Sequence, residues 1–318
     1  MPAAYQTRED IRGSTGLLYD ELAKQQANPL ILEKGSGLIE YTDKRGVKRL
    51  LFTTAGDKSS IVGRVLAESK NRTALLAKHL AIPIPTSIVC ATIQDARLFL
   101  EQHRRIVIKP LRGTGGRGVS TDIKSEKILD KAYAYAESSG RGVVAQQHIN
   151  GADVRLLTIG GVFTSAVMRE PAHVIGDGTS TILELIHIAN TTPPRNDPAL
   201  MSIMAISLSA AEQLLDTSIT QIPAEGEKVY VAGPANVSLG GSLHEATHLV
   251  TPAMIADAEK ISQRAGLGIC GVDMMWDRAA DKHYLIEVND TPGIDIHNDP
   301  FSGTKSDCVQ QYVQWLIA

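Results

Sequence analysis

The chain has 318 residues, 43% of them hydrophobic and 21% charged, a length that can bury a sizeable core and predicts about two domains or subdomains. Its formal net charge of −3 argues against nucleic-acid binding and favours small-molecule partners, while self-association stays open. The N-terminus has no apolar leader and no apolar run is long enough to span a bilayer, so we expect a cytoplasmic protein without a membrane partner.

The first part of the chain alternates helical patterns with short strands. A helix is predicted at 17–26, and three strands separated by turn residues follow it, at 29–34, 37–43 and 47–54. A second helix begins at Lys70 and ends before the prolines Pro83 and Pro85, which lack the N–H group that a continuing helix needs. We therefore treat residues 1–69 as a short N-terminal segment.

Residues 105–122 predict a strand, a glycine-rich loop and a second strand. The loop GTGGRG formally matches GxGxxG, but the residues after it do not begin the helix that a dinucleotide fold requires. At a hairpin tip these glycines allow backbone N–H groups to approach phosphate oxygens, and Arg117 adds positive charge. Lys109, in the apolar strand before the loop, needs a partner such as a nucleotide phosphate. The alternative is a flexible surface hairpin whose lysine reaches solvent.

The middle of the chain predicts further strands and two capped helices. Strands are expected at 143–149 and 154–170, the latter a hairpin that turns at Gly160 and Gly161. Thr181 and Glu184 have the spacing of a capping box at the start of a helix. A later helix is predicted from Thr251, with this threonine as its N-cap and Pro252 at its first position.

The last two predicted strands, 268–277 and 283–289, form a hairpin with a polar turn near Asp281. Strand alternation places Glu287 and Asn289 on one face, and Tyr284, Ile286 and Val288 on the other. Asp273, in the preceding strand, can complete an all-oxygen ligand set suited to Mg²⁺. The alternative is an ordinary hairpin with one solvated face.

These motifs follow one another in the order typical of ATP-grasp ligases. The matching stretches are Lys70 with Thr73, VIKPLRGTGGRGV, QQHINGADVR, HVIGDGTSTILELI, VYVAGPANVSLGG and GVDMMWD with YLIEVNDTPG. From about Gly35 onward the chain resembles the ATP-grasp part of cyanophycin synthetases and of bifunctional glutathione synthetases. Residues 1–34 match no motif.

The resemblance implies an α+β fold in which two subdomains clasp ATP. The lid subdomain, with its glycine-rich hairpin, is expected over 70–147. The C-terminal subdomain, with the Mg²⁺ site, is expected over 148–318. Residues 1–69 are then a pre-ATP-grasp-like segment.

The resemblance also implies roles for the residues that match the nucleotide site. Lys70 and Lys109 match phosphate-contacting lysines that act in catalysis, and Arg155 matches an arginine that faces the transferred phosphate. Asp153 matches a contact to the ribose hydroxyls. The phosphate lid corresponds to Gly113, Gly115, Gly116, Arg117 and Gly118. Gln146 stands where a glutamate usually accepts a hydrogen bond from the adenine amino group, and a glutamine carbonyl can still accept that bond.

Asp273, Glu287 and Asn289 match the family's ligands for Mg²⁺ (or Mn²⁺), so the resemblance and the strand alternation select the same side chains. Candidate substrate contacts are Arg169, His173, Asn236, Ser238, Gly240 and Asp295. In the stretches that match the substrate-binding part of the family, this sequence departs from the usual pattern. Ala232 replaces an arginine, Leu239 replaces a threonine, and Asp295 stands where an arginine is common. We expect from this reversed charge that one substrate carries an extra amine or guanidinium that pairs with Asp295, unless Asp295 caps the turn.

The implied activity is an ATP-dependent carboxylate–amine ligase that forms an amide or peptide bond through an acyl phosphate and releases ADP and phosphate. Its expected substrates are small carboxylates and amines, such as amino acids or peptides. Two alternatives stay open. The departures at Ala232 and Leu239 are compatible with a nucleotide-binding regulatory module, and a phosphotransferase would transfer the same phosphoryl group without releasing phosphate.

Overall fold

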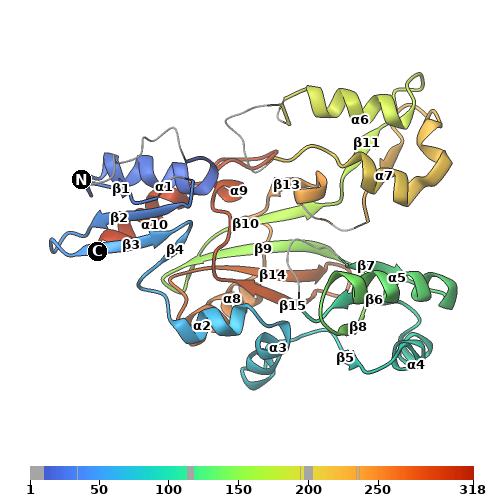
Figure 1. Ribbon diagram of the computed structural model, residues 1–318, viewed down its shortest axis with the longest axis horizontal. Coiled ribbons are helices and arrows are strands. Elements are labelled where there is room, and N and C mark those ends of the chain that lie inside the picture. The colour runs from blue at the N-terminus through green and yellow to red at the C-terminus, as the bar shows by residue number, and fades with distance from the viewer. Residues whose placement is uncertain are drawn as a thin grey trace.

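The structure is a computed structural model that describes residues 11–33, 35–112, 118–193, 195–196, 203–233, 235 and 237–318. Within these residues the strands form four separate sheets, around which the helices are arranged (Figure 1). None of the helices in this described part combines the length and the apolar character needed to cross a membrane.

The N-terminal segment and the C-terminal helix share one core. Helix α1 (Gly13–Lys24) precedes an antiparallel sheet of four strands, β1 (Leu30–Ile31), β2 (Leu38–Thr42), β3 (Lys48–Phe52) and β4 (Ala55–Gly56). Helix α10 (Cys308–Ile317) packs beside α1, and Leu18, Ile39 and Tyr312 are buried together between these elements (Figure 1). The predicted helix is confirmed, although it begins at Gly13 rather than at residue 17, and the three predicted strands are present as β1, β2 and β3.

A five-stranded antiparallel sheet lies at the centre of the molecule, in the order β13-β10-β9-β14-β15. Its strands are β9 (Ala152–Ile159), β10 (Val162–Glu170), β13 (Ser242–Glu245), β14 (Ile269–Asp277) and β15 (Lys282–Asn289). The predicted turn at Gly160 and Gly161 joins β9 to β10. Helix α8 (Pro252–Ala265) covers one face, and the Thr251 hydroxyl accepts from the Met254 N–H as the predicted N-cap.

The helices α2 (Ile61–Ala67) and α3 (Lys70–His79) pack with the same central core. Ala77 of α3 is fully buried there, beside Val154, Val272 and Leu285 of the sheet. The predicted second helix is therefore confirmed, and its packing partners belong to the central sheet.

The predicted hairpin β14–β15 is confirmed, but one part of its predicted alternation is wrong. Asp273 pairs with Glu287, whereas Met274 pairs with Leu285, so one residue of β15 is extra. As a result Leu285 and Val288, three positions apart, both pack in the core under α8, while Ile286 lines a cavity. A strict two-residue period assumes an unbroken ladder, and a bulge breaks it.

A second four-stranded sheet, in the order β5-β8-β6-β7, has one open face. Its strands are β5 (Ser87–Cys90), β6 (Ile106–Pro110), β7 (Ser120–Ile123) and β8 (Val143–Gln147). Helices α4 (Ile93–His103) and α5 (Glu126–Ser139) cover the other face around Phe99, Ile108 and Leu129. The predicted hairpin exists as β6 and β7, and its tip, residues 113–117, lies outside the described residues.

A smaller unit is built around the strand pair β11 (His173–Ile175) and β12 (Lys228–Tyr230). Helices α6 (Ile182–Thr191) and α7 (Leu208–Leu215) and the 3₁₀ turns η2 (Asp216–Thr220) and η3 (Val237–Leu239) accompany this pair. The predicted capping box of Thr181 and Glu184 is present at the start of α6. A last short helix, α9 (Asp295–Asn298), follows β15.

Candidate functional site

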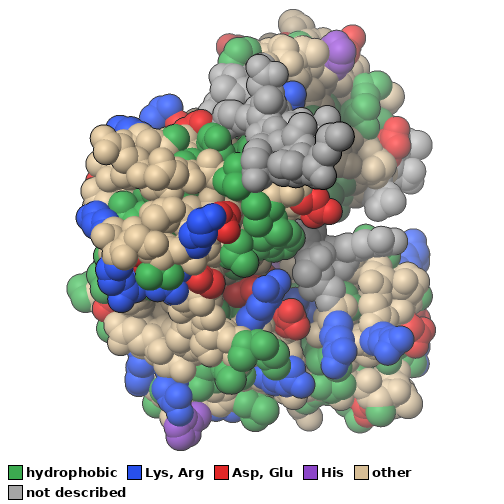
Figure 2. All heavy atoms as spheres, turned by 60° about the vertical axis from the view of Figure 1, so that its left-hand side comes forward, with side chains coloured by type: hydrophobic (Ala, Val, Ile, Leu, Met, Phe, Trp, Pro, Cys, Tyr) green, Lys and Arg blue, Asp and Glu red, His purple; other side chains and the backbone are tan. Residues whose placement is uncertain are grey.

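A cavity of about 190 Å³ lies between α3, the bulged part of β15 and the open face of the second sheet. Its lining is mixed, with apolar side chains such as Ile84, Ile88 and Ile286 beside polar and charged ones. The space-filling view shows a notch at the right-hand edge of the molecule, between the parts that lie above and below it (Figure 2). The two predicted lysines, Lys70 and Lys109, both line the cavity. The fold thus brings together two cations that are 39 positions apart in the sequence, counted from their numbers.

Lys109 is almost completely buried, with 5% of its surface exposed. Its Nζ donates to Gln146 Oε1 at 2.8 Å. Burial lowers the pKa of Lys109 to about 8, and the nearby charge of Lys70 adds to this effect. Lys70 forms an ion pair with Glu287 at 3.2 Å. The cavity therefore holds one ammonium that is paired with a carboxylate and one whose side-chain acceptor is a neutral amide.

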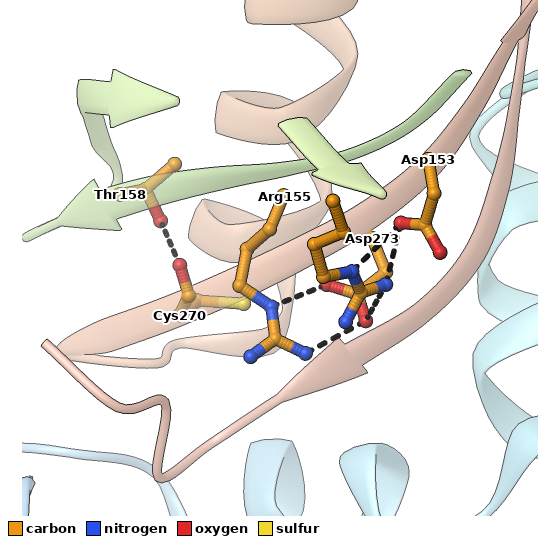
Figure 3. Close-up of polar contacts among 6 residues, drawn as sticks. Asp153, Arg155, Thr158, Cys270 and Asp273 are labelled. Carbon is orange, nitrogen blue, oxygen red and sulfur yellow. Dashed lines mark hydrogen bonds and ion pairs between the residues drawn. The ribbon is translucent and has the colours of Figure 1, made fainter. Parts of the chain in front are cut away.

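An ionic cluster of two arginines and two aspartates lies on the central sheet (Figure 3). Strand pairing sets it up, because Arg155 stands opposite Asp273 and Asp153 stands opposite Arg169. Arg155 donates to both oxygens of Asp273, from Nε at 2.6 Å and from Nη2 at 2.8 Å. Arg169 donates from Nη2 to Asp273 Oδ2 at 3.0 Å and to Asp153 Oδ1 at 2.6 Å.

Asp273 is the centre of this cluster and is 1% exposed. Burial opposes its ionisation, but the charges of Arg155 and Arg169 outweigh burial and hold the pKa of Asp273 at about 2. The cluster faces away from α8, because the neighbouring residues Val154 and Val272 point into the core beneath that helix. An anionic ligand that approaches this cluster would therefore meet the guanidinium N–H donors of Arg155 and Arg169.

The three predicted metal ligands lie on one hairpin. Glu287 pairs directly with Asp273, and Asn289 pairs with Gly271. The buried Asn289 Nδ2 has no hydrogen-bond partner among the described residues, so this N–H group can still donate to an acceptor on a ligand. Among the described residues no group of three or more His, Cys, Asp or Glu is placed to hold a metal ion. Any metal site here depends on the asparagine oxygen and on ligands from outside the protein.

The candidate substrate residues are distributed unevenly. Arg169 belongs to the ionic cluster, whereas His173 lies on β11 and its Nδ1 donates to the Pro171 carbonyl at 3.1 Å. Gly240 has a φ of +87°, and a Cβ there would lie 2.4 Å from Ile206 Cα, so its backbone conformation and packing account for the glycine. Asn236 and the side chain of Ser238 lie outside the described residues.

Asp295 is tied to the N-terminal helix. Its Oδ1 accepts a hydrogen bond from the Ser14 hydroxyl, and Ser14 Oγ in turn accepts from the Ile294 N–H at 3.0 Å. The carboxylate thus already has a partner within the chain. This contact favours the alternative in which Asp295 fixes the turn before α9.

His297 is a buried polar residue that the sequence did not single out. It is 1% exposed, its Nδ1 lies 3.0 Å from Ser165 Oγ, and its Nε2 has no partner among the described residues. Burial, reinforced by Arg155, lowers its pKa to about 3, so it is neutral. The signal for it in the sequence is its position eight residues after Asn289, a predicted metal ligand.

Comparisons with known proteins agree with this geometry. The family model of the ATP-grasp domain of prokaryotic glutathione synthetase matches residues 43–178. Cyanophycin synthetase from Trichormus variabilis is 33% identical over 79% of this chain and 29% of its own length. The bifunctional glutathione biosynthesis protein from Clostridium perfringens is 30% identical over 97% of this chain and 41% of its own length. The chain therefore spans less than half of these relatives.

A solved structure is similar along nearly the whole chain. The bifunctional glutathione synthetase from Pasteurella multocida superposes with a TM-score of 0.70 and 22% identity, covering 96% of this chain and 43% of that one. At this level of identity the likeness establishes the fold. The described sheets and helices accordingly have the ATP-grasp arrangement that the sequence motifs predicted.

Proposed function

We propose that this chain, an ATP-grasp protein by its fold and by its sequence relatives, uses ATP to join a small carboxylate to an amine. The relatives named above are synthetases, but the chain spans only part of each, so their activity is carried over here as a proposal. The substrates that we propose are amino acids or peptides.

One observation carries the proposal. Lys70 and Lys109 line one cavity, and Lys70 is paired with Glu287, which stands directly opposite Asp273 and its two arginines. A nucleotide whose base enters the apolar part of the cavity would therefore extend its phosphates toward cations on one side and toward oxygen ligands on the other. Phosphoryl transfer needs this combination of positioning and charge neutralisation.

The chemistry follows from the weakness of a carboxylate as an electrophile. Its oxygen attacks the terminal phosphorus of ATP, ADP leaves, and the carboxylate becomes an acyl phosphate. An amine then attacks the acyl carbon, the C–O bond to phosphate breaks, and inorganic phosphate and the amide are released. We propose that Lys70, Lys109 and Arg155 stabilise the negative charge that develops on the transferred phosphoryl group.

The oxygen set of Asp273, Glu287 and Asn289 fits Mg²⁺ in its donor chemistry, and the ion would neutralise phosphate charge when bound. In the free protein Arg155 forms an ion pair with Asp273, and Lys70 forms one with Glu287. We propose that the phosphates of the nucleotide bind Arg155 and Lys70 in place of the carboxylates. The oxygens of Asp273 and Glu287 would then be free to bind the metal. We also propose that residues 113–118 cover the phosphates and keep water from the acyl phosphate.

The proposal is tested by incubating the protein with ATP, Mg²⁺, hydroxylamine and a pool of amino acids and dipeptides. We expect ADP, phosphate and a hydroxamate, because hydroxylamine replaces the amine. Glu287→Gln should nearly abolish turnover, since a ligand charge is lost, while Glu101→Gln on the exposed surface of α4 should not change it. Formation of AMP, or a fully active Glu287→Gln variant, would refute the proposal.

A further inference from the structure

The turn that follows β15 lies beside the side chain of Arg155. A Cβ added to Gly271 would lie 3.0 Å from Pro292 Cβ, and 3.4 Å and 3.5 Å from Cδ and Nε of Arg155. The proline ring and the stem of the arginine therefore share the space above Gly271, where the missing side chain leaves room for both. From this point the guanidinium reaches Asp273, to which its Nε donates at 2.6 Å (Figure 3).

Two hydroxyl groups of the N-terminal segment hold this turn. Thr54 is 2% exposed, and its Oγ1 donates to the Pro292 carbonyl at 3.0 Å. Ser14 Oγ, in the first turn of α1, accepts from the Ile294 N–H at 3.0 Å and donates to Asp295 Oδ1. The partners are 238 positions apart for the Pro292 contact and 280 for the Ile294 contact, so only the folded chain brings them together.

Helix α10 contacts both the turn and the residue that supports it. Tyr312 Oη donates to the Thr54 carbonyl at 2.6 Å, and Cys308 Sγ lies 3.7 Å from the Ile294 carbonyl oxygen. Tyr312 and Cys308 are buried in the core that α10 shares with α1 and the first sheet. A displaced turn would leave buried polar groups without partners, so these contacts favour a single position of the turn.

We infer that Thr54 and Ser14 are positioning residues for Arg155 and act through the turn at Pro292. The inference rests on the proposed function, in which Arg155 stabilises the transferred phosphoryl group. The turn restricts the stem of the arginine, so the constraint remains whether the guanidinium binds Asp273 or a phosphate. The N-terminal segment, which supplies no predicted site residue, thereby takes part in the reaction.

A purely structural role of these hydroxyls predicts a different result. If they only stabilise the fold, their loss lowers the free energy of unfolding and leaves turnover of the folded protein unchanged. If they position Arg155, their loss lowers kcat, because a displacement of about 1 Å can cost up to about a hundredfold in rate. The dissociation constant of ATP should stay nearly unchanged, since the cavity that we assign to the base is lined by other residues.

The test compares Thr54→Val with Thr54→Ser. Valine has the shape of threonine without the hydroxyl, whereas serine retains the hydroxyl. Phosphate release is measured with saturating ATP, Mg²⁺, hydroxylamine and the pool of amino acids and dipeptides. We expect turnover to fall at least about tenfold in Thr54→Val and to stay within about twofold in Thr54→Ser. Ser14→Ala and Ser14→Thr repeat the comparison at the half-buried second contact.

Thr251→Ala is the matched control for stability. It removes a hydroxyl that accepts from the Met254 N–H at 3.3 Å, at the start of α8 on the other face of the central sheet. This variant is destabilised through the loss of a hydrogen bond as well, but its turnover should equal that of the unmodified protein. Equal turnover in Thr54→Val and Thr251→Ala would overturn the inference.

A second readout does not depend on activity. The Nε–H of Arg155 is hydrogen-bonded to Asp273 in the free protein and gives an NMR signal that Arg155→Lys assigns by its loss. Exchange of this proton with water should become about tenfold faster in Thr54→Val, the factor that one lost hydrogen bond supplies, and stay unchanged in Thr251→Ala. An unchanged exchange rate in folded Thr54→Val would contradict the inference.

The two proposals fail separately. If the unmodified protein releases no phosphate with any member of the pool, the proposed function fails, and the exchange rates still decide whether the turn positions Arg155. If the unmodified protein turns over and Thr54→Val is equally active, the proposed function stands and the positioning role fails.

Discussion

Lys109 links the structure to a pH dependence at the scale of a single residue. Its pKa in the free protein is about 8, because burial disfavours the charged form. A nucleotide phosphate stabilises that charge, so the affinity for ATP should be constant below the pKa and fall by up to about tenfold per pH unit above it. Dissociation constants measured between about pH 7 and pH 9.5 test this. Lys109→Met should bind weakly without the slope, and a flat profile in the unmodified protein would exclude the phosphate contact.

Asp273 gives a prediction about stability. Its removal by Asp273→Asn leaves Arg155 and Arg169 buried without their shared counter-ion, which should cost about 3 to 5 kcal/mol in the free energy of unfolding. Urea unfolding measures this loss. The pKa of about 2 lies below the unfolded value, so the stabilisation is present above the unfolded pKa and is lost as the pH falls through about 2. A cost below about 1 kcal/mol would show that Asp153 alone balances the charge of the two arginines.

The order of the motifs predicted that Lys70, Lys109, Asp273 and Glu287 belong to one site, and this assignment stays a prediction. It could not predict which contacts they make. The arginine partners of Asp273 depend on the register between β9 and β14, and the orientation of Gln146 depends on a lysine in a neighbouring strand. Such contacts between distant residues leave no local pattern in the sequence.

At the scale of elements, capping signals and turn residues predicted boundaries well, whereas the bulge in β15 was missed. A helix cap depends on residues that are close together in the sequence. A bulge depends on how two strands pair with each other and pack on the core. The bulge matters here because it places Ile286 in the cavity and keeps Leu285 and Val288 in the core.

The cap of α8 supplies a prediction at the element scale. Thr251→Ala removes the hydroxyl that accepts from the Met254 N–H and should destabilise the protein by about 1 kcal/mol. Thr251→Ser keeps the hydroxyl and should lie within about 0.5 kcal/mol of the unmodified protein. Because α8 covers the face of the sheet opposite the ionic cluster, kcat should not change in either variant. Thermal or urea unfolding together with an activity assay checks both statements, and equal stability of the two variants would contradict them.

At the scale of the whole molecule, the alternation of helices and strands predicted mixed α and β architecture, and the motifs predicted the ATP-grasp fold. The smaller unit around β11 and β12 was not foreseen as a separate core, because its two strands are far apart in the sequence, with α6, α7 and η2 between them. The subdomain limits stay a proposal. The packing of α3 with the central sheet suggests that the lid begins after this helix, near Pro83.

The central claim is that a substrate carboxylate is activated by the terminal phosphoryl group of ATP. It is tested most directly by supplying amino acids and dipeptides labelled with ¹⁸O in their carboxylates and analysing the released phosphate by mass spectrometry. An acyl phosphate that is attacked at its acyl carbon transfers one labelled oxygen to phosphate, so each turnover should yield singly labelled phosphate together with ADP and an amide. Turnover that yields unlabelled phosphate, or label in AMP, would contradict the account.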